Sequence, residues 1–100
     1  NVPAYSSSKG GVAQLTKSLA IAYASDAIRV NALAPGWIAT PLTKGLRDDP
    51  VRNEGILVRT PLKRWGTPED LVEPALFLAS AGAGFITGTI LNVDGGYAIV

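Results

Sequence analysis

The amino-acid sequence predicts an α/β fold, in which a parallel β-sheet carries helices on its faces. Hydrophobic and turn-forming residues follow the order helix, strand, irregular segment, helix, strand, and strands that alternate with helices indicate a parallel sheet. Hydrophobic residues make up 47% of the 100 residues and charged residues 17%, which favours a buried core over a disordered chain. Two strands cannot cover both faces and both edges of a parallel sheet. We therefore expect further strands from upstream residues of a parent chain or from another chain.

The first predicted helix covers about residues 3–24, and a short buried strand follows over residues 28–34. Pro3 suits a first helical turn. Apolar side chains recur along this helix at helical spacing, at Val12, Leu15 and Leu19. The strand is predicted to end at Pro35-Gly36, because these two residues break regular structure.

The second half of the chain contains an irregular segment, a helix and a strand. Residues 44–64 have the least regular pattern. Thr67 is a suitable helix cap with Pro68 in the first turn, and apolar residues then continue to about Ser80. Residues 89–93 form the second predicted strand, which ends at a turn of one aspartate and two glycines.

The composition excludes several classes of function. The chain contains no cysteine and no histidine, which excludes disulfides, thiol nucleophiles, Cys/His zinc sites and a histidine base, and we expect no metal site. The formal net charge is +1, without the basic excess that is typical of nucleic-acid-binding modules. Apolar stretches such as residues 19–24 are far shorter than a membrane span, so we expect no membrane partner and a cytoplasmic location. The chain also lacks methionine, and we expect it to be a piece of a longer protein.

Tyr5 and Lys9 are the two residues best suited to carry out chemistry. Residues four apart share one face of a helix, with Cβ atoms about 5–6 Å apart. At about 5 Å and an effective dielectric constant of about 20, the lysine charge favours the phenolate by about 3 kcal/mol, which lowers the tyrosine pKa by roughly 2. A tyrosine with such a pKa can exchange a proton with a substrate oxygen. The spacing alone favours an ordinary surface pair, because such pairs are common.

Several motifs, taken in their order along the chain, resemble the short-chain dehydrogenase/reductase family. The motifs are Tyr5-x-x-x-Lys9, Arg29-Val30-Asn31, Pro35-Gly36, Thr40-Pro41, Gly66-Thr67-Pro68-Glu69-Asp70-Leu71, Thr87-Gly88 and Val93-Asp94-Gly95-Gly96. The resemblance covers essentially the whole chain. It implies the C-terminal portion of a Rossmann-type doubly wound parallel sheet with three αβα layers. It also implies an oxidoreductase that transfers a hydride between NAD or NADP and an alcohol or carbonyl substrate.

The resemblance implies a role for each matching position. Tyr5 is the expected acid/base, and Lys9 is expected to lower its pKa and to hydrogen-bond the nicotinamide ribose. Ile38 is expected to contact the nicotinamide carboxamide through its backbone, and Thr40 through its hydroxyl. The expected cofactor-binding residues are Tyr5, Lys9, Pro35, Gly36, Ile38 and Thr40.

Local patterns leave simpler alternatives open for some of these residues. Pro35-Gly36 is compatible with a plain turn, and Thr40 with a helix cap before Pro41. Residues 82–88 superficially suggest a phosphate-binding loop. They follow a helix and precede a strand, which is the reverse of the required order, so we expect them only to separate two elements.

Residues 1–100 lack the family's Gly-rich cofactor motif, the residue that selects NAD or NADP, and the serine that assists the tyrosine. We therefore expect residues 1–100 to be the C-terminal part of a single NAD(P)-binding Rossmann-type domain, without its N-terminal cofactor half. A second interpretation is a truncated module that has no catalytic activity and serves only as an assembly surface.

Residues 37–65, which we call the lid segment, occupy the place of the family's substrate lid. Residues 44–64 carry an excess of three positive charges, which favours an anionic or polyhydroxylated substrate but also fits plain surface charge. The residues around Gly36 and Arg59 are similar to those of sugar-acid dehydrogenases such as gluconate 5-dehydrogenase, and of 3-oxoacyl-carrier-protein reductases. Trp37 is expected either to line the substrate side of the pocket or to pack under the lid segment. The family also implies a homo-oligomer, either a dimer or a homotetramer.

Overall fold

The computed structural model describes residues 2–99, with side chains described from residue 10 onwards. The chain divides into two compact units. The first unit contains residues 1–32 and 77–91, and the second unit contains residues 33–76 and 92–100.

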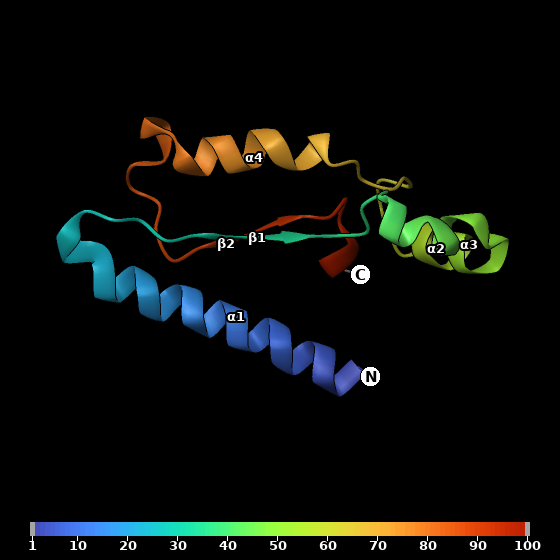
Figure 1. Cartoon of the computed structure of the whole chain (residues 1–100), viewed down its shortest axis with the longest axis horizontal. Coiled ribbons are helices and arrows are strands. Elements are labelled where there is room, and N and C mark those ends of the chain that lie inside the picture. The colour runs from blue at the N-terminus through green and yellow to red at the C-terminus, as the bar shows by residue number, and fades with distance from the viewer. Residues whose placement is uncertain (1, 100) are drawn as a thin grey trace. The chain divides into compact units, whose positions relative to one another are not determined.

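The first unit begins with the long helix α1, Val2–Tyr23, which is drawn in blue in Figure 1. A 3₁₀ turn, Ala24–Asp26, ends it, so the predicted helix and its predicted end near Ser25 are confirmed. Within α1, Thr16 and Ala20 are buried, and the Thr16 hydroxyl donates to the Val12 carbonyl oxygen at 2.8 Å. Gly88 approaches this helix closely, because a Cβ atom on it would lie 3.5 Å from the Cβ of Ala20.

The first strand, β1, is shorter than predicted and starts later. It covers Ala32–Pro35, whereas the sequence predicts a strand over residues 28–34. In the structure the side chains of Arg29 and Asn31 hold residues 28–31: Arg29 donates to three carbonyl oxygens, and Asn31 binds Ile86 O and Thr89 N. Side-chain hydrogen bonds thus hold residues 28–31 together with one backbone bond, in which Gly88 N–H donates to Val30 O at 2.7 Å. The backbone pairing continues with Ala32 N–H donating to Thr89 O at 3.0 Å.

The second strand, β2, covers Ile90–Val93 and pairs with β1 in a two-stranded sheet. The pairing is parallel: Ala32 N–H donates to Thr89 O, and four residues later Gly36 N–H donates to Val93 O at 3.1 Å. Figure 1 shows the two strands running side by side. Helices around a parallel pair of strands confirm the predicted α/β class.

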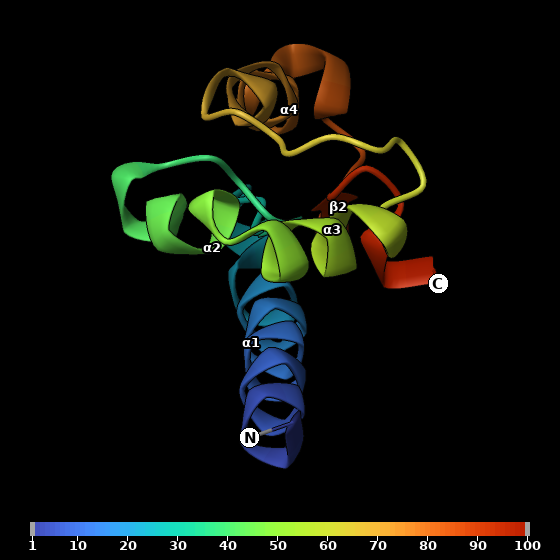
Figure 2. The same cartoon turned by 90° about the vertical axis from the view of Figure 1, so that its right-hand side faces the viewer.

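The lid segment is more regular than predicted. It contains a 3₁₀ turn, Pro41–Thr43, and two helices, α2 (Lys44–Asp48) and α3 (Pro50–Val58), which lie next to each other in Figure 2. The expectation of an irregular segment is therefore wrong. Helix α3 starts at Pro50 because the Asp49 carboxylate accepts hydrogen bonds from Val51 N and Arg52 N at 3.1 and 3.3 Å.

Helix α4 covers Glu69–Ala79 and begins where the sequence predicts, just after Thr67-Pro68. A 3₁₀ turn, Ala81–Ala83, follows it in the first unit. The chain leaves β2 through the predicted turn, in which Gly95 and Gly96 adopt positive φ angles of 62° and 92°. Glycine adopts such angles without steric cost.

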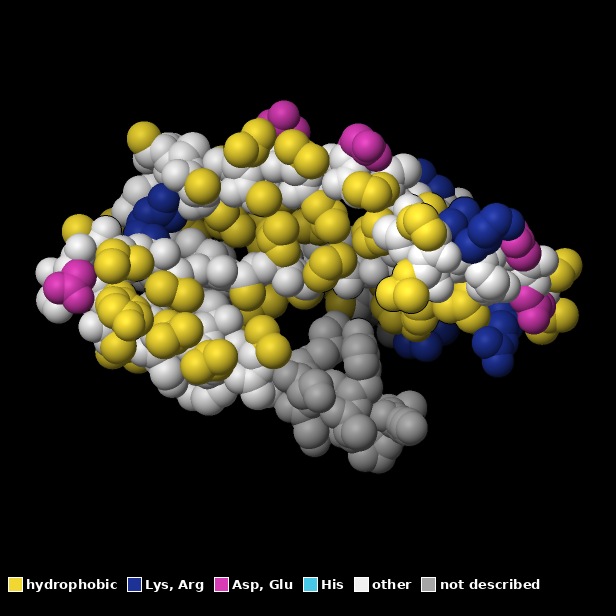
Figure 3. Space-filling view, in the orientation of Figure 1, with side chains coloured by type: hydrophobic (Ala, Val, Ile, Leu, Met, Phe, Trp, Pro, Cys, Tyr) yellow, Lys and Arg dark blue, Asp and Glu magenta, His cyan; other side chains and the backbone are white. Residues whose placement is uncertain are grey.

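Few side chains of the described part are fully covered. Ala20, Ala83, Thr16 and Thr60 are the buried residues that the structure shows. Large apolar side chains are exposed on α1, among them Val12, Leu15 and Ile21. Figure 3 shows hydrophobic side chains gathered over the described part of this helix. No helix within residues 2–99 has the length and apolar character needed to cross a membrane.

Candidate functional site

Tyr5 and Lys9, the predicted catalytic pair, lie on α1 in the first unit. Their position on one helix, four residues apart, is as expected from the sequence. Their side chains lie outside the described residues, so their roles stay predictions. All other predicted site residues belong to the second unit.

Pro35 and Gly36 lie at the carboxyl end of β1. Gly36 is in close contact with the residue that follows β2, because a Cβ atom on Gly36 would lie 2.7 Å from both Cα and Cβ of Asp94. Asp94 is itself fixed, since its carboxylate accepts from Gly96 N at 2.9 Å and from Ala98 N at 3.0 Å. Gly36 is thus required by the close approach of two strand ends, whatever else this turn does.

Ile38 takes part in an isolated parallel bridge with Gly66, just before α4. Ala39 N–H donates to Gly66 O at 2.8 Å, and Gly66 N–H donates to Trp37 O at 2.9 Å. In an extended chain, successive backbone groups point to opposite sides. The N–H and C=O of Ile38 therefore point away from Gly66.

The two backbone groups of Ile38 differ in their hydrogen bonding. The carbonyl oxygen accepts from the Thr43 hydroxyl at 2.8 Å. The N–H has no acceptor among the described residues. Within the part of the chain that the structure describes, this donor is thus free, and it follows the carboxyl end of β1 by three residues, near where ligands of α/β proteins commonly bind.

Thr40 occupies the position before the Pro41–Thr43 turn, as the helix-cap alternative predicts. Its N–H donates to the Thr43 hydroxyl at 3.0 Å, and its carbonyl oxygen accepts from Arg47 Nη2 at 2.6 Å. The Arg47 guanidinium carbon also lies 6.0 Å from the centre of the Trp65 ring. Hydrogen bonds from Thr43 and from Arg47 on α2 thus fix the backbone of Thr40.

Trp37 belongs to an aromatic cluster of the second unit. Its ring centre lies 6.0 Å from that of Trp65 and 6.4 Å from that of Tyr97, both in edge-to-face geometry. The Trp65 Nε1–H donates to Asn53 Oδ1 at 2.6 Å, and the Arg59 guanidinium lies 4.7 Å from the Tyr97 ring centre. Trp37 therefore packs against the end of the lid segment and the C-terminal turn, and a role towards substrate stays a prediction.

A pocket of about 220 Å³ opens at the carboxyl ends of β1 and β2, within the second unit. It combines residues that follow each strand with residues from the end of the lid segment and the start of α4. The lining residues are Gly36, Trp37, Ile38, Thr60, Leu62, Arg64, Gly66, Asp70, Asn92, Val93, Asp94 and Gly95. Three of the predicted site residues, Gly36, Trp37 and Ile38, are thus brought together in one pocket.

Two ion pairs shape the electrostatics of the second unit. Lys44 Nζ lies 2.6 Å from Asp48 Oδ2, and Arg64 Nη1 lies 2.8 Å from Asp70 Oδ2. The hydrogen bond from Lys44 holds the pKa of the Asp48 carboxyl below its usual range. The pKa of the Asp70 carboxyl is lowered by the hydrogen bond from Arg64 and next by that from the Thr67 backbone, and Asp70 raises the pKa of Arg64.

The pairing of Arg64 with Asp70 and the bridge between Gly66 and Ile38 were not predicted from the sequence. Both involve the stretch from Arg64 to Asp70, most of which is a family motif. One sequence signal indicates that Asp70 binds the start of α4: an aspartate three residues after Thr67 fits the acidic member of a capping box. Nothing in the sequence pattern indicated which segment Gly66 would pair with.

Comparison with known proteins shows the family. A family model described as "Enoyl-(Acyl carrier protein) reductase" matches residues 1–98 of this chain. The chain belongs to the short-chain dehydrogenase/reductase family. The resemblance stated from the sequence motifs is therefore confirmed.

Characterised members of the short-chain dehydrogenase/reductase family are similar to this chain over nearly all of its length. It is 53% identical over 96 residues to a 2-dehydro-3-deoxy-D-gluconate 5-dehydrogenase of Bacillus subtilis, covering 96% of this chain and 38% of that protein. It is 50% identical over 95 residues to the galactitol 2-dehydrogenase (L-tagatose-forming) of Cereibacter sphaeroides, covering 95% of this chain and 37% of that protein. The chain thus spans less than two fifths of the length of these relatives.

Solved structures of the short-chain dehydrogenase/reductase family share the fold. One from Agrobacterium tumefaciens, assigned as a 2-deoxy-D-gluconate 3-dehydrogenase and solved with NADP, is 51% identical with a TM-score of 0.91, covering 98% of this chain and 40% of that one. A 4-hydroxyisoleucine dehydrogenase in complex with NADH is 36% identical with a TM-score of 0.92, with the same coverage of 98% and 40%. The predicted Rossmann-type α/β class is confirmed.

Proposed function

We propose that this chain forms part of an oxidoreductase that transfers a hydride between NAD or NADP and an alcohol or carbonyl substrate. The observation that carries the proposal is the free N–H of Ile38 at the carboxyl end of β1, beside the close contact of Gly36 with Asp94. A backbone donor in this position fits the carboxamide oxygen of a nicotinamide ring. Similarity to dehydrogenases that were solved with NADP and with NADH supports the same cofactors here.

In the proposed reaction, Tyr5 exchanges the proton of the substrate oxygen and Lys9 stabilises the phenolate form of Tyr5. NAD(P), when bound, supplies the group that accepts or donates the hydride. During alcohol oxidation, Tyr5 takes the hydroxyl proton while the carbon–hydrogen bond breaks with its electron pair, leaving a carbonyl. Ile38, Gly36 and Thr40 hold the nicotinamide end of the cofactor.

We further propose a sugar acid or a polyol as the substrate class. The relatives named above include dehydrogenases of both kinds. Of the six cationic residues in the lid segment, Lys44 and Arg64 are paired with aspartates, and four make no ion pair among the described residues. The remaining charge favours an anionic or hydroxyl-rich ligand, whereas a 3-oxoacyl substrate of the same family is the alternative.

The expected domain organisation, location and assembly are parts of this proposal. Residues 1–100 supply the C-terminal part of one Rossmann-type domain, which acts in the cytoplasm as a homo-oligomer. Exposed apolar side chains on α1 and at the C-terminal turn, such as Ile21 and Ile99, support a covered surface in an assembly. Sedimentation analysis of the full-length gene product tests this, and a monomer at all concentrations would contradict it.

Replacement of Tyr5 tests the catalytic role in the full-length product of the gene that encodes this chain. We expect Tyr5→Phe to lower kcat by at least about 100-fold with sugar acids, polyols and short 3-oxoacyl substrates, because the proton relay is lost. Tyr23→Phe is the matched control, since Tyr23 lies at the other end of α1. Wild-type turnover of Tyr5→Phe with every substrate would overturn the assignment.

The non-catalytic alternative is tested by calorimetry of the 100-residue chain with NADH and NADPH. The alternative concerns the 100-residue chain by itself and predicts that this chain binds neither cofactor. Binding of NADH or NADPH to the isolated chain at micromolar concentration would contradict it.

A further inference from the structure

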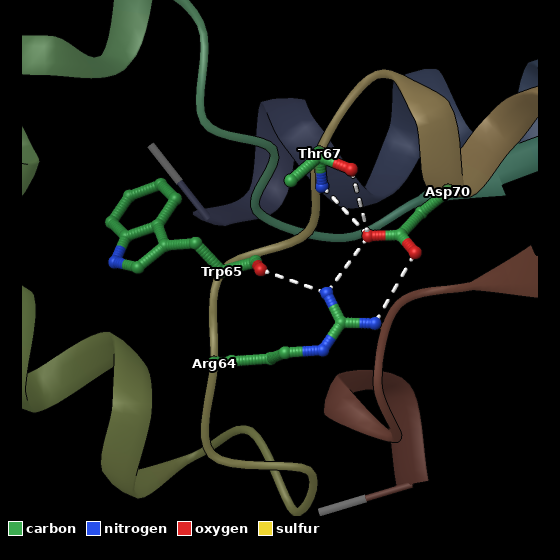
Figure 4. Close-up of polar contacts among 4 residues, drawn as sticks. All are labelled: Arg64, Trp65, Thr67 and Asp70. Atoms are coloured by element: carbon green, nitrogen blue, oxygen red, sulfur yellow. Dashed lines mark hydrogen bonds and ion pairs between the residues drawn. The ribbon is translucent and has the colours of Figure 1, made fainter.

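The Asp70 carboxylate collects hydrogen-bond donors from both sides of Gly66. Asp70 Oδ2 accepts from Arg64 Nη1 at 2.8 Å, and Oδ1 accepts from Arg64 Nη2 at 3.2 Å. From the other side of Gly66, Thr67 donates to Oδ2 through its backbone N–H at 2.8 Å and through its hydroxyl at 3.2 Å. Figure 4 shows the guanidinium between the carboxylate and the Trp65 carbonyl oxygen, to which it also donates at 3.1 Å. The segment that contains Gly66 is therefore tied at both ends to one side chain.

The contact between Gly66 and Ile38 carries this restraint to the free backbone donor. Gly66 makes two backbone hydrogen bonds across the bridge, one to the residue before Ile38 and one to the residue after it. A Cβ atom on Gly66 would lie 2.7 Å from Cδ1, the flexible end of the Ile38 side chain, and at an ordinary contact distance of 3.7 Å from Asp70 Oδ2, so the two backbone hydrogen bonds are the firmer link. A shift of Gly66 therefore moves the peptide groups on both sides of Ile38.

The exposure of this ion pair argues against a large contribution to folding. The side chains of Arg64 and Asp70 are 56% and 32% exposed, and exposed ion pairs contribute little to stability. Their geometry is nevertheless specific, because the planar guanidinium uses two nitrogens on two carboxylate oxygens. Such an arrangement restricts orientation more than it stabilises the fold.

We propose that Arg64 and Asp70 are positioning residues for cofactor binding, which act through Gly66 to hold the Ile38 N–H where it meets the nicotinamide carboxamide. This inference rests on the proposed function and adds two residues that act on cofactor binding through Gly66. Its distinctive consequence is that the pair affects the nicotinamide end of the cofactor and leaves the ADP-ribose end unaffected.

The test compares ligands with and without a nicotinamide ring, in the full-length gene product. Dissociation constants are measured by calorimetry for NADH and ADP-ribose, and for NADPH and 2′-phospho-ADP-ribose. The ratio within each pair isolates the contribution of the nicotinamide ring. A general loss of folding or of the phosphate site lowers both affinities and leaves the ratio unchanged.

We expect Arg64→Met and Asp70→Asn each to weaken NADH or NADPH binding by about fivefold to tenfold, an effect of the size of one well-placed hydrogen bond. Binding of the matching ADP-ribose ligand should change by less than about twofold. Arg64→Met keeps the hydrogen bonds between Thr67 and Asp70, so it separates positioning from the cap of α4. The double variant should bind NADH or NADPH no more weakly than the single variant with the lower affinity, because both changes break the same contact.

Asp48→Asn is the matched control, because Asp48 forms the other ion pair of the lid segment and makes no contact with Gly66. It should leave the ratio unchanged. Arg64→Lys keeps the positive charge but loses the bidentate hydrogen bonding to the Asp70 carboxylate. It should therefore retain part of the affinity that is lost in Arg64→Met.

Three results would overturn the inference: an unchanged ratio in Arg64→Met, a parallel loss of both ligands, or an equal effect of Asp48→Asn. If the unmodified protein binds ADP-ribose but gains nothing from the nicotinamide ring, the inference fails while a role in nucleotide binding survives. If it binds neither dinucleotide at all, the proposed function fails as well.

Discussion

Two arginines hold backbone segments in different ways, one in each unit of the chain. Arg29, in the first unit, donates to the carbonyl oxygens of Leu78, Ser80 and Ile86 at 2.8, 3.2 and 3.2 Å. Arg64, in the second unit, donates to the carboxylate of Asp70 at 2.8 and 3.2 Å. The first satisfies neutral carbonyl oxygens at the end of α4 and in the segment that follows it, and the second forms an exposed ion pair.

This difference separates residues that support the fold from residues that shape a site. The last carbonyl groups of a helix have no N–H partner in the helix itself. Arg29 supplies donors for them in a part-buried place, so its loss leaves unsatisfied polar groups. Arg64 can be removed without leaving its partner out of water, so we expect its loss to change geometry more than stability.

Replacing Arg29 is expected to give the largest effect on stability. Arg29→Met should lower the free energy of unfolding of the full-length gene product by about 2–3 kcal/mol, because part-buried carbonyl oxygens lose a charged donor. Denaturant-induced unfolding measures this change. Arg52→Met is the control, since Arg52 is exposed on α3 and its side chain makes no hydrogen bond among the described residues. Equal effects of the two substitutions would contradict the scaffold role of Arg29.

Gly36 extends the comparison to the backbone of the second unit. Gly36→Ala should cost about 1–3 kcal/mol, because the new Cβ atom would lie 2.7 Å from Cα of Asp94 and the two strand ends would have to separate. Gly45→Ala is the matched control: a Cβ atom there meets nothing within 4 Å. Because Gly45 lies in α2, alanine should stabilise the protein by about 0.5–1 kcal/mol. If Gly36→Ala left the free energy of unfolding unchanged, the two strand ends would separate at no cost, which would contradict this expectation.

The elements that could be predicted from the sequence are those set by local patterns. The apolar spacing of α1, the Thr67-Pro68 start of α4 and the glycines after β2 each act within a few residues, and all three are confirmed. Helix α3 of the lid segment could also have been predicted, because Asp49 is a suitable cap and Pro50 follows it in the first turn.

The features that could not be predicted depend on partners far away in the sequence. The start of β1 is displaced because Arg29 and Asn31 bind residues about fifty positions later. The bridge between Ile38 and Gly66 likewise depends on how the whole lid segment folds back. Of the predicted site, the structure brings Gly36, Trp37 and Ile38 together, while the roles of Tyr5 and Lys9 stay predictions.

The response to acid should distinguish the two arginine sites. The pKa of Asp70 is lowered in the folded protein, first by the hydrogen bond from Arg64. Its stabilising contribution is therefore complete above the ordinary aspartate pKa of about 3.9 and is lost as the pH falls through the lower, folded value. The amide signal of Thr67 in NMR spectra should follow this titration, and Asp70→Asn should abolish it. The amide signals of residues 78–80, near Arg29, should show no matching step, because the partners of Arg29 do not titrate. A titration step in the amide signals of residues 78–80 would contradict this difference between the two arginine sites.

The smallest effect is expected at the second ion pair of the lid segment. Lys44 and Asp48 are 67% and 61% exposed, so solvent screens their attraction and folding gains little from it. Asp48→Asn should shift the Tm by less than about 1 °C, and salt should reduce this shift further, because it screens exposed charges. Asp48 and Asp70 are both aspartates with a lowered pKa and a cationic partner. If they nevertheless differ in their effect on nicotinamide binding, the cause is that only Asp70 is connected to the segment that holds Ile38.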